Sequence, residues 1–130
     1  MNEKYLICEE GLRNVVQDGK KVGWEFWLRI PYYAGVPLSM IDHLKVTIDG
    51  EAVPEEAIRF NTSCGEVFTL QELETVTTYR WEYGEKARIT VLQDGGLAPG
   101  RHKLEVDVAL RIIYMPKGNS SYAWAEFDVE

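Results

Sequence analysis

The two histidines are the residues whose chemistry would matter most if this chain held a metal. His43 lies beside Asp42 and ahead of Asp49, which makes a mixed histidine and carboxylate site conceivable. A metal site normally needs three or four convergent ligands, and the sequence near His43 offers no further candidate. His102 lies in the stretch LAPGRHKL, and we interpret it as a structural residue of a turn that the Pro-Gly pair creates. We therefore expect no metal and no cofactor on this chain.

Paired carboxylates are the next candidates, because two of them at a suitable separation can perform acid–base catalysis. The chain offers Glu9-Glu10, Glu55-Glu56, and Glu72 with Glu74. Neighbouring residues on a strand point to opposite faces, so we interpret the first pair as solvated charge, and the second falls in a predicted loop. No GxSxG, HExxH, P-loop or GxGxxG pattern occurs. We expect no catalytic residue on this chain.

Aromatic residues are the most informative feature, since four Trp, seven Tyr and four Phe make up 12% of the chain. Strand periodicity places Trp27, Tyr122 and Trp124 on solvent-facing sides beside charged residues, and the same interpretation puts Trp81 and Tyr83 outside the core. Outward Trp and Tyr beside charges are typical of binding surfaces. The alternative is that a second layer of loops covers them.

The stretch RIPYYAGVPLS presents two adjacent tyrosines on a loop. Pro31 ends the preceding strand because it removes a ladder donor, Gly35 permits a bend, and Pro37 stiffens the exit. Tyr32 and Tyr33 are therefore predicted to be displayed on a rigid loop, where they would lose little entropy on binding. The residues alone leave open whether the loop contacts a sugar or a protein.

The elements that position these residues are predicted strands, because apolar residues recur with a period of two. The alternating segments are residues 12–17, 22–30, 44–48, 87–91, 104–114 and 122–129. Asp18-Gly19 predicts a hairpin turn between the first two segments, and Asp49-Gly50 predicts another turn. Thr69 and Glu72 fit a capping box, so at most one short helix is expected.

Short strands separated by turn signals, without crossover helices, indicate an all-β protein. We predict an antiparallel β-sandwich that forms a single domain over residues 1–130. A jelly-roll order and an immunoglobulin-like order of strands both fit the sequence, and the pairing of strands cannot be read from it.

Charge and hydropathy exclude several classes of partner. The net charge is −7, and no cluster of Lys and Arg suits a phosphate backbone, so neither nucleic acid nor a membrane is expected as a partner. No apolar run approaches the ~20 residues of a membrane span, and the amino terminus lacks the apolar region of a signal peptide. We interpret Cys8 and Cys64 as reduced thiols, which fits an expected cytoplasmic location.

Seven motifs follow one another along the chain: LRNV at 12–15, GWEFWLRIPYY at 23–33, GVPLS at 35–39 with Ile41, VTIDG at 46–50, RWE at 80–82, GGLAPGRH at 95–102 and LRIIYMP at 110–116. In this order and spacing they resemble the small β-subunit family of bacterial C-glycoside deglycosidases. The resemblance runs over most of the chain. No single motif carries it, because each is short.

The resemblance implies a division of labour between two chains. The partner α-subunit is expected to resemble sugar isomerases and epimerases, with a TIM-type barrel and a divalent metal, expected to be manganese. It would cleave the carbon–carbon bond between a 3-oxo sugar and an aromatic aglycone. This chain would be a non-catalytic β-subunit that binds and stabilises that α-subunit. The predicted partner interface consists of Arg29, Tyr32, Tyr33, Gly35, Pro37, Leu38, Trp27 and Trp124.

Two other functions fit the residues less well. A stand-alone carbohydrate-binding β-sandwich would stack Trp and Tyr on sugar faces, but such modules are usually secreted or tethered to a catalytic domain. A small cupin-like enzyme would need a cluster of histidines, and this sequence has only two histidines.

Overall fold

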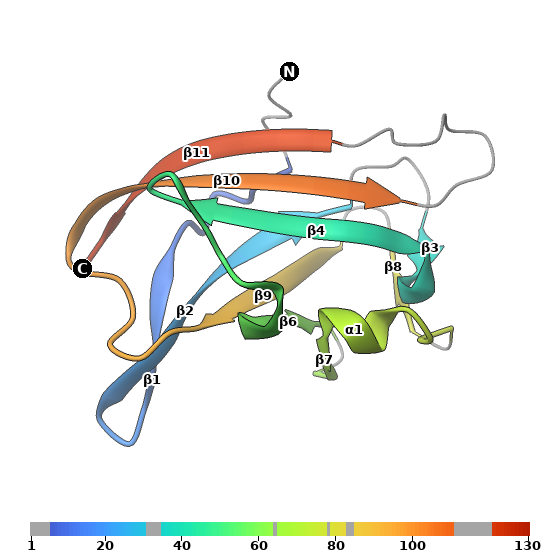
Figure 1. Cartoon of the computed structure of the whole chain (residues 1–130), viewed down its shortest axis with the longest axis horizontal. Helices are drawn as coiled ribbons and strands as arrows, with labels where there is room; N and C mark the ends of the chain where they lie inside the picture. The colour runs from blue at the N-terminus through green and yellow to red at the C-terminus, as the bar shows by residue number, and fades with distance from the viewer. Residues whose placement is uncertain (1–5, 31–34, 64, 78, 83–84, 111–120) are drawn as a thin grey trace.

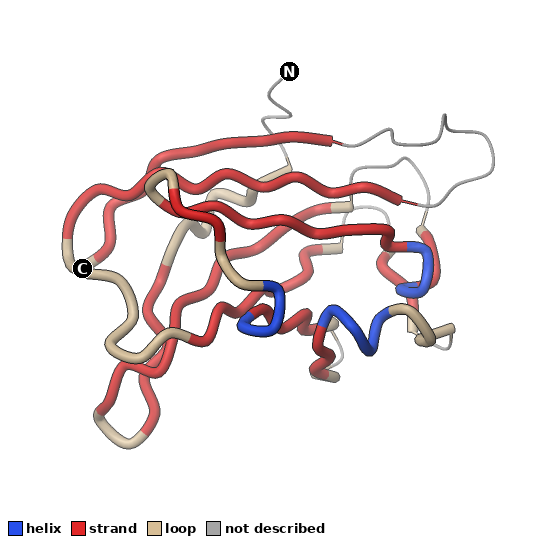
Figure 2. Tube along the Cα trace, in the orientation of Figure 1, coloured by secondary structure: helices blue, strands red, loops and turns tan. Residues whose placement is uncertain are grey.

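A computed structural model describes residues 6–30, 35–63, 65–77, 79–82, 85–110 and 121–130. In these residues two β-sheets lie one above the other, and the short helical segments gather at one edge (Figure 1). Figure 2 shows how far strands dominate the chain trace. The predicted all-β antiparallel sandwich is confirmed.

The first sheet has five strands in the spatial order β1-β2-β9-β6-β7, and each pair is antiparallel. These strands are β1 (Arg13–Gln17), β2 (Lys20–Arg29), β9 (Lys86–Leu92), β6 (Ile58–Asn61) and β7 (Val67–Thr69). The second sheet has four strands in the order β11-β10-β4-β5. These strands are β11 (Ser121–Val129), β10 (Gly100–Leu110), β4 (Ile41–Ile48) and β5 (Glu51–Ala52).

The remaining elements are short. A two-stranded ribbon pairs β3 (Val36–Pro37) with β8 (Arg80–Trp81). The helical segments among the described residues are the 3₁₀ turns η1 (Leu38–Met40) and η2 (Glu55–Ala57) and the α-helix α1 (Leu70–Leu73). Thr69 caps α1 and Glu72 reaches back to the Thr69 amide, so the predicted capping box is confirmed.

The strand order distinguishes between the two predicted topologies. Immunoglobulin constant-type domains have strands A, B, E and D in one sheet and C, F and G in the other. Here β1, β2, β9 and β6 occupy the first four positions, and β4, β10 and β11 occupy the other three. The order is therefore immunoglobulin-like, with β5 and β7 added at the edges.

The alternation of buried and exposed residues explains why these segments are strands. In β2, Trp24, Phe26 and Leu28 are fully buried, whereas Glu25 and Trp27 lie on the outer side. The inward residues of β4, β9 and β10 alternate in the same way. Burying these apolar side chains between the sheets stabilises the fold by roughly 25 cal/mol per Å² of apolar surface.

The hairpin between β1 and β2 forms where the sequence predicts it. Asp18 and Gly19 have φ values of 51° and 78°, as a two-residue turn of type I′ requires. A bulge between Val15 and Val16 then shifts the register by one residue. As a result Arg13 pairs with Glu25, and not with Trp24, whose side chain lies on the core side.

Trp81 corrects one sequence-based prediction. We expected this residue on an exposed surface, but its side chain is fully buried in β8. Its ring meets Phe60 edge to face, with 5.4 Å between centroids, and its Nε1 donates to the Glu85 carbonyl at 3.0 Å. The expectation failed because β8 has only two residues, which is too short to show a period. Tyr83 lies outside the described residues.

Helices among the described residues are all too short and too polar to cross a membrane.

Candidate partner interface

Trp27 lies in the second half of β2, on the outer side of the five-stranded sheet, and is half-buried. The Arg13 guanidinium of β1 lies over its ring, 4.6 Å from the centroid. Such a cation–π contact is worth about 0.5–1 kcal/mol at an exposed site. Arg13 and the sheet together restrict the ring, so Trp27 presents a fixed aromatic edge.

The strand register extends this surface in a row across four strands. Trp27 pairs with Arg88 of β9, Arg88 pairs with Asn61 of β6, and Asn61 pairs with Val67 of β7. The Asn61 side-chain amide donates from Nδ2 to the Arg88 carbonyl at 2.8 Å and to the Thr90 hydroxyl at 3.0 Å. Directly paired residues of antiparallel strands point to the same side, so all four side chains of the row share the outer face.

Charged residues surround the row. Arg88 lies 3.5 Å from Glu25, whose side chain is only 16% exposed. Lys86 pairs with Arg29 across the strands and forms an ion pair with Glu10 at 2.8 Å. This hydrogen bond lowers the pKa of Glu10 and raises the pKa of Lys86. We call this surface the Trp27 face, and define it as Glu10, Arg13, Glu25, Trp27, Arg29, Asn61, Val67, Lys86, Arg88 and Leu92.

The β3–β8 ribbon continues from the end of the sheet where β2 finishes and β9 begins. Arg80 donates through Nη2 to the Gly35 carbonyl at 2.9 Å, and its Nε bonds Glu82 at 2.9 Å. Pro37 pairs with Arg80 in the ribbon and is half-buried. Trp27, Arg29, Gly35 and Pro37 therefore follow one another along a single path in the chain. Tyr32 and Tyr33 lie outside the described residues, and their interface role stays a prediction.

Leu38 does not fit the predicted surface. Its side chain is fully buried in the core, and its amide donates to the Tyr79 carbonyl at 3.0 Å. A leucine at the start of η1 is drawn inward because burying it removes apolar surface from water. Leu38 therefore holds the ribbon against the core and offers no side-chain surface to a partner.

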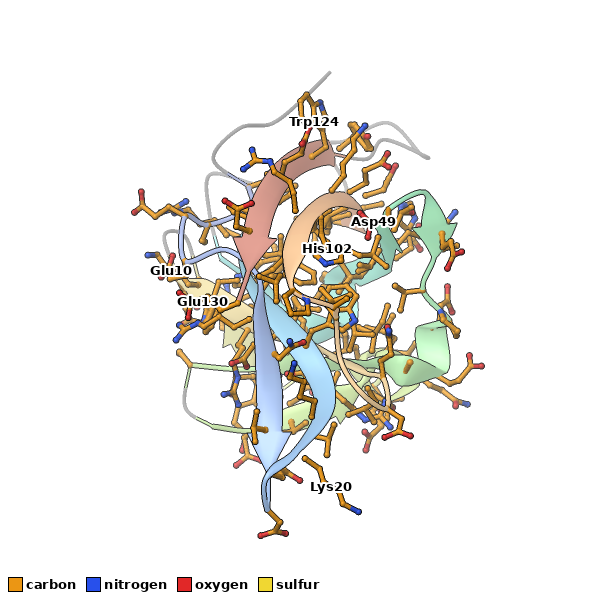
Figure 3. All side chains as sticks on the ribbon, turned by 90° about the vertical axis from the view of Figure 1, so that its left-hand side faces the viewer. Glu10, Lys20, Asp49, His102, Trp124 and Glu130 are labelled. Atoms are coloured by element: carbon orange, nitrogen blue, oxygen red, sulfur yellow. The ribbon has the colours of Figure 1, made fainter. Side chains whose placement is uncertain are left out.

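Trp124 lies on the other sheet, in β11. Its side chain is 41% exposed, and the Lys103 ammonium lies 5.0 Å from its ring centroid. Figure 3 shows Trp124 above β11, away from the β1–β2 hairpin. Trp27 and Trp124 were predicted as parts of one interface, but the fold places them on opposite outer faces of the sandwich.

The side chains around Trp124 pair among themselves. Arg101 contacts Glu126 at 3.3 Å and Asp128 at 3.5 Å. The Tyr122 hydroxyl donates to Glu105 at 2.6 Å, which raises the pKa of Tyr122. We call this surface the Trp124 face, and define it as His43, Lys45, Thr47, Arg101, Lys103, Glu105, Asp107, Tyr122, Trp124, Glu126 and Asp128.

Comparison with known proteins supports the resemblance noted in the sequence. The family model of the C-glycoside deglycosidase beta subunit matches residues 2–114. The chain belongs to this family. It is 33% identical over 115 residues to a C-glycoside deglycosidase beta subunit of Eubacterium cellulosolvens, a match that covers 88% of this chain and 78% of the relative.

Two further relatives carry related names. A 3'-dehydrocarminate deglycosidase beta subunit of a Microbacterium species is 32% identical over 119 residues, with 89% of each chain covered. A C-glycoside deglycosidase beta subunit of Microbacterium trichothecenolyticum is 32% identical over 112 residues, covering 84% of this chain and 79% of the relative.

The two histidines of this family member have partners within the chain. His43 Nε2 lies 2.7 Å from Asp107 on the Trp124 face. His102 contacts Asp49 through Nδ1 at 2.5 Å and the Ala98 carbonyl through Nε2 at 2.7 Å. Within the described ranges no three His, Cys, Asp or Glu side chains converge as a metal site would require. That the chain holds no metal stays a prediction.

The fold separates some of the candidate carboxylates and leaves others near one another, since Glu55, Glu56 and Glu74 line one cleft. Glu10 pairs with Lys86, and the Glu72 carboxylate accepts from the Thr69 amide, which lowers the pKa of Glu72. Glu55 and Glu56 of η2 border an open cleft of about 510 Å³ between β4 and α1. The cleft is lined by Ile41, Asp42, His43, Leu44, Glu55, Glu56, Arg59, Thr69, Leu70, Gln71, Leu73 and Glu74. This lining contains no Trp, Tyr or Phe on which a sugar could stack.

Of the ten residues of the Trp27 face, the sequence prediction of the interface named only Trp27 and Arg29, and Arg13 and Arg88 are two of the eight that it missed. Arg88 could have been found, because it alternates with the inward residues of β9. Arg13 could not, because a regular hairpin from the Asp18-Gly19 turn would pair it with Trp24, on the core side. Only the bulge moves it beside Glu25 and Trp27.

The contacts of His102 predict a pH dependence of stability. Both ring nitrogens face oxygen acceptors, an arrangement that suits the doubly protonated ring. The Asp49 carboxylate, followed by the Ala98 carbonyl, raises the pKa of His102 above 6.5, and the same contact lowers the pKa of Asp49 below 3.8. The His102 contribution is therefore complete below pH 6.5 and is lost as pH rises through its folded-state pKa.

We expect the free energy of unfolding, measured by urea denaturation at a series of pH values, to fall across that alkaline interval. His102→Gln should remove this part of the slope, because glutamine does not titrate. At acid pH the Asp49 contribution, present above 3.8, should disappear as pH falls through its own folded-state pKa. An unchanged alkaline slope in His102→Gln would contradict the assignment.

Proposed function

We propose that this chain is the non-catalytic β-subunit of a C-glycoside deglycosidase and that it assembles with an α-subunit that performs the chemistry. The observation that carries the proposal is the family match over residues 2–114, together with three relatives named as beta subunits. The two outward Trp residues, which a lone domain has little reason to expose, support a role in assembly.

The α-subunit of the proposed complex resembles sugar isomerases and epimerases and holds a divalent metal, manganese in our proposal. It cleaves the carbon–carbon bond of a 3-oxo C-glycoside after abstracting a proton. This chain contributes binding and stabilisation of the α-subunit, and no group that touches the reacting atoms. The complex is proposed to work in the cytoplasm, where the buried thiol of Cys8 stays reduced.

A stand-alone carbohydrate-binding module is the second candidate, because exposed Trp side chains can stack on sugars. The contacts of the two rings argue against it. Arg13 lies over Trp27 and Lys103 lies over Trp124, so one face of each ring already carries a cation. A sugar stacks on an open ring face, and the cations over Trp27 and Trp124 reduce the area of ring that a sugar could contact.

Co-expression tests the proposal. Produced with its α-subunit, the chain should co-purify as a complex that buries more than about 1,000 Å², the size of a stable interface. The complex should cleave a 3-oxo C-glycoside and contain a divalent metal, whereas the purified chain alone should do neither. A chain that ignores the α-subunit in gel filtration, or that turns the substrate over alone, would refute the proposal.

A further inference from the structure

We propose that the α-subunit docks on the Trp27 face, and that the surface it brings there carries carboxylates around an apolar centre. This inference rests on the proposed function, because it names the surface through which the β-subunit assembles. It also excludes the Trp124 face from the contact. Trp27 would be the central aromatic anchor, and the exposed side chains of Arg88 and Val67 would extend the contact along the row, in which Asn61 itself is buried.

The first support is charge. The Trp27 face contains four basic residues, Arg13, Arg29, Lys86 and Arg88, and two acidic ones, Glu10 and Glu25. The whole chain has 14 basic and 21 acidic residues, so the remainder has 10 basic residues against 19 acidic ones. A surface with an excess of two positive charges on a chain of net charge −7 favours a partner with carboxylates.

The second support is the composition of the face. Val67 is 53% exposed and Leu92 is 46% exposed, and both lie on the outer side of the same sheet as Trp27. Trp and Arg are the residue types most enriched among binding hot spots, and aliphatic neighbours exclude water from them. The Arg88 side chain is 48% exposed and can still donate to a partner carboxylate, in the paired geometry that arginine favours.

The third support is the contrast with the Trp124 face. That face contains three basic residues and four acidic ones, and its contacts join Arg101 to Glu126 and Asp128, Tyr122 to Glu105, and His43 to Asp107. Ion pairs also occur on the Trp27 face, between Lys86 and Glu10 and between Arg88 and Glu25, so the contrast lies in the balance of charge, which is two positive on the Trp27 face and one negative on the Trp124 face. An antiparallel sheet can keep one face in contact with water, and the polar outer side of the β11-β10-β4-β5 sheet fits such a face.

The geometry limits the shape of the partner. The row from Trp27 to Val67 crosses four neighbouring strands, which spans roughly 14 Å at about 4.8 Å per strand. At one border of the face, Glu10 and Arg13 also line an open cleft of about 490 Å³ together with residues of β1 and β11. The partner surface must therefore extend along this row and be acidic at the positions that meet Arg88 and Arg13.

Two pairs of matched variants test the inference, because each Trp has one cation over its ring. Trp27→Ala and Arg13→Glu change the proposed interface. Trp124→Ala and Lys103→Glu make the same changes on the opposite face. Each variant is mixed with the α-subunit that co-purifies with the wild-type chain, and the dissociation constant and association rate are measured at several salt concentrations. Thermal denaturation of each variant shows that it is folded.

Trp27→Ala and Arg13→Glu should each weaken binding by about tenfold or more. Arg13→Glu should also slow association and flatten its salt dependence, because steering by opposite charge is lost. The Trp124 and Lys103 variants should bind within about twofold of wild type, as exposed residues outside an interface do. Weakening by the Trp124 pair, or wild-type binding by the folded Trp27 pair, would overturn the inference. If the wild-type chain binds no α-subunit, the proposed function itself fails.

Discussion

Replacing Trp81 by Ala is expected to lower the free energy of unfolding by about 3–5 kcal/mol, the usual cost of removing a buried Trp. The side chain is 1% exposed, and its loss would leave a cavity beside Phe60. It would also remove the hydrogen bond that Trp81 Nε1 donates to the Glu85 carbonyl. Native proteins have free energies of unfolding of about 5–15 kcal/mol, so this one change would remove a large part of the total. Urea denaturation, followed by tryptophan fluorescence and circular dichroism, measures the difference.

Trp124→Ala is the matched control for this prediction. It removes the same side chain from an exposed position, where the Lys103 ammonium lies 5.0 Å from the ring centroid. We expect a loss below about 1 kcal/mol, the range of an exposed cation–π contact. Equal destabilisation by the two variants would show that Trp81 is not the buried residue of the pair.

Gly23→Ala is expected to destabilise the fold by about 1–3 kcal/mol, because it overpacks the contact between β2 and β9. A Cβ at this position would lie 2.2 Å from the Val91 carbonyl oxygen and 3.2 Å from the Leu92 Cα. Both are backbone atoms in the ladder between the strands, so relief requires the strands to separate. Denaturation midpoints of the variant and the wild type give the size of the effect.

Gly35→Ala separates this steric argument from the general effect of replacing a glycine. Its Cβ would lie 2.1 Å from Glu82 Oε2, which is the end of a flexible side chain. Glu82 can rotate away at the expense of its exposed ion pair with Arg80, so we expect a loss below about 1 kcal/mol. A Gly35→Ala variant as unstable as Gly23→Ala would contradict the distinction between backbone and side-chain neighbours.

The β3–β8 ribbon contains both buried residues and residues of the predicted interface. Trp81 and Leu38 are fully buried and support the ribbon from inside the core, whereas Gly35 and Pro37 are half-buried. Variants of Trp81 and Leu38 are expected to alter the proposed assembly through folding. Variants of Gly35 and Pro37 can alter it directly. Binding experiments on this region therefore need a stability measurement for every variant.

Local patterns in the sequence determined most of the secondary structure. The alternation of Trp24, Phe26 and Leu28 is enough to predict β2, because a strand with one buried face must repeat with a period of two. Asp18-Gly19 specifies its turn, because both residues tolerate a positive φ. Thr69 and Glu72 specify the start of α1, because their side chains satisfy amides that the first helical turn leaves unpaired. Each of these signals is complete within a few residues.

Only the tertiary structure decided which surface these elements create. Periodicity tells that Trp27 and Trp124 face away from the core, but their separation on opposite sheets depends on which strands pair, and pairing is set by contacts distant in sequence. Arg13 reaches Trp27 only because a bulge leaves one extra residue, Val22, in β2 opposite Val15 and Val16 of β1. Trp81 is buried only because Phe60, from another strand, packs against it. Non-local packing of this kind leaves no period in a short segment, and for that reason the sequence alone could predict the sandwich but not which side chains share each outer face.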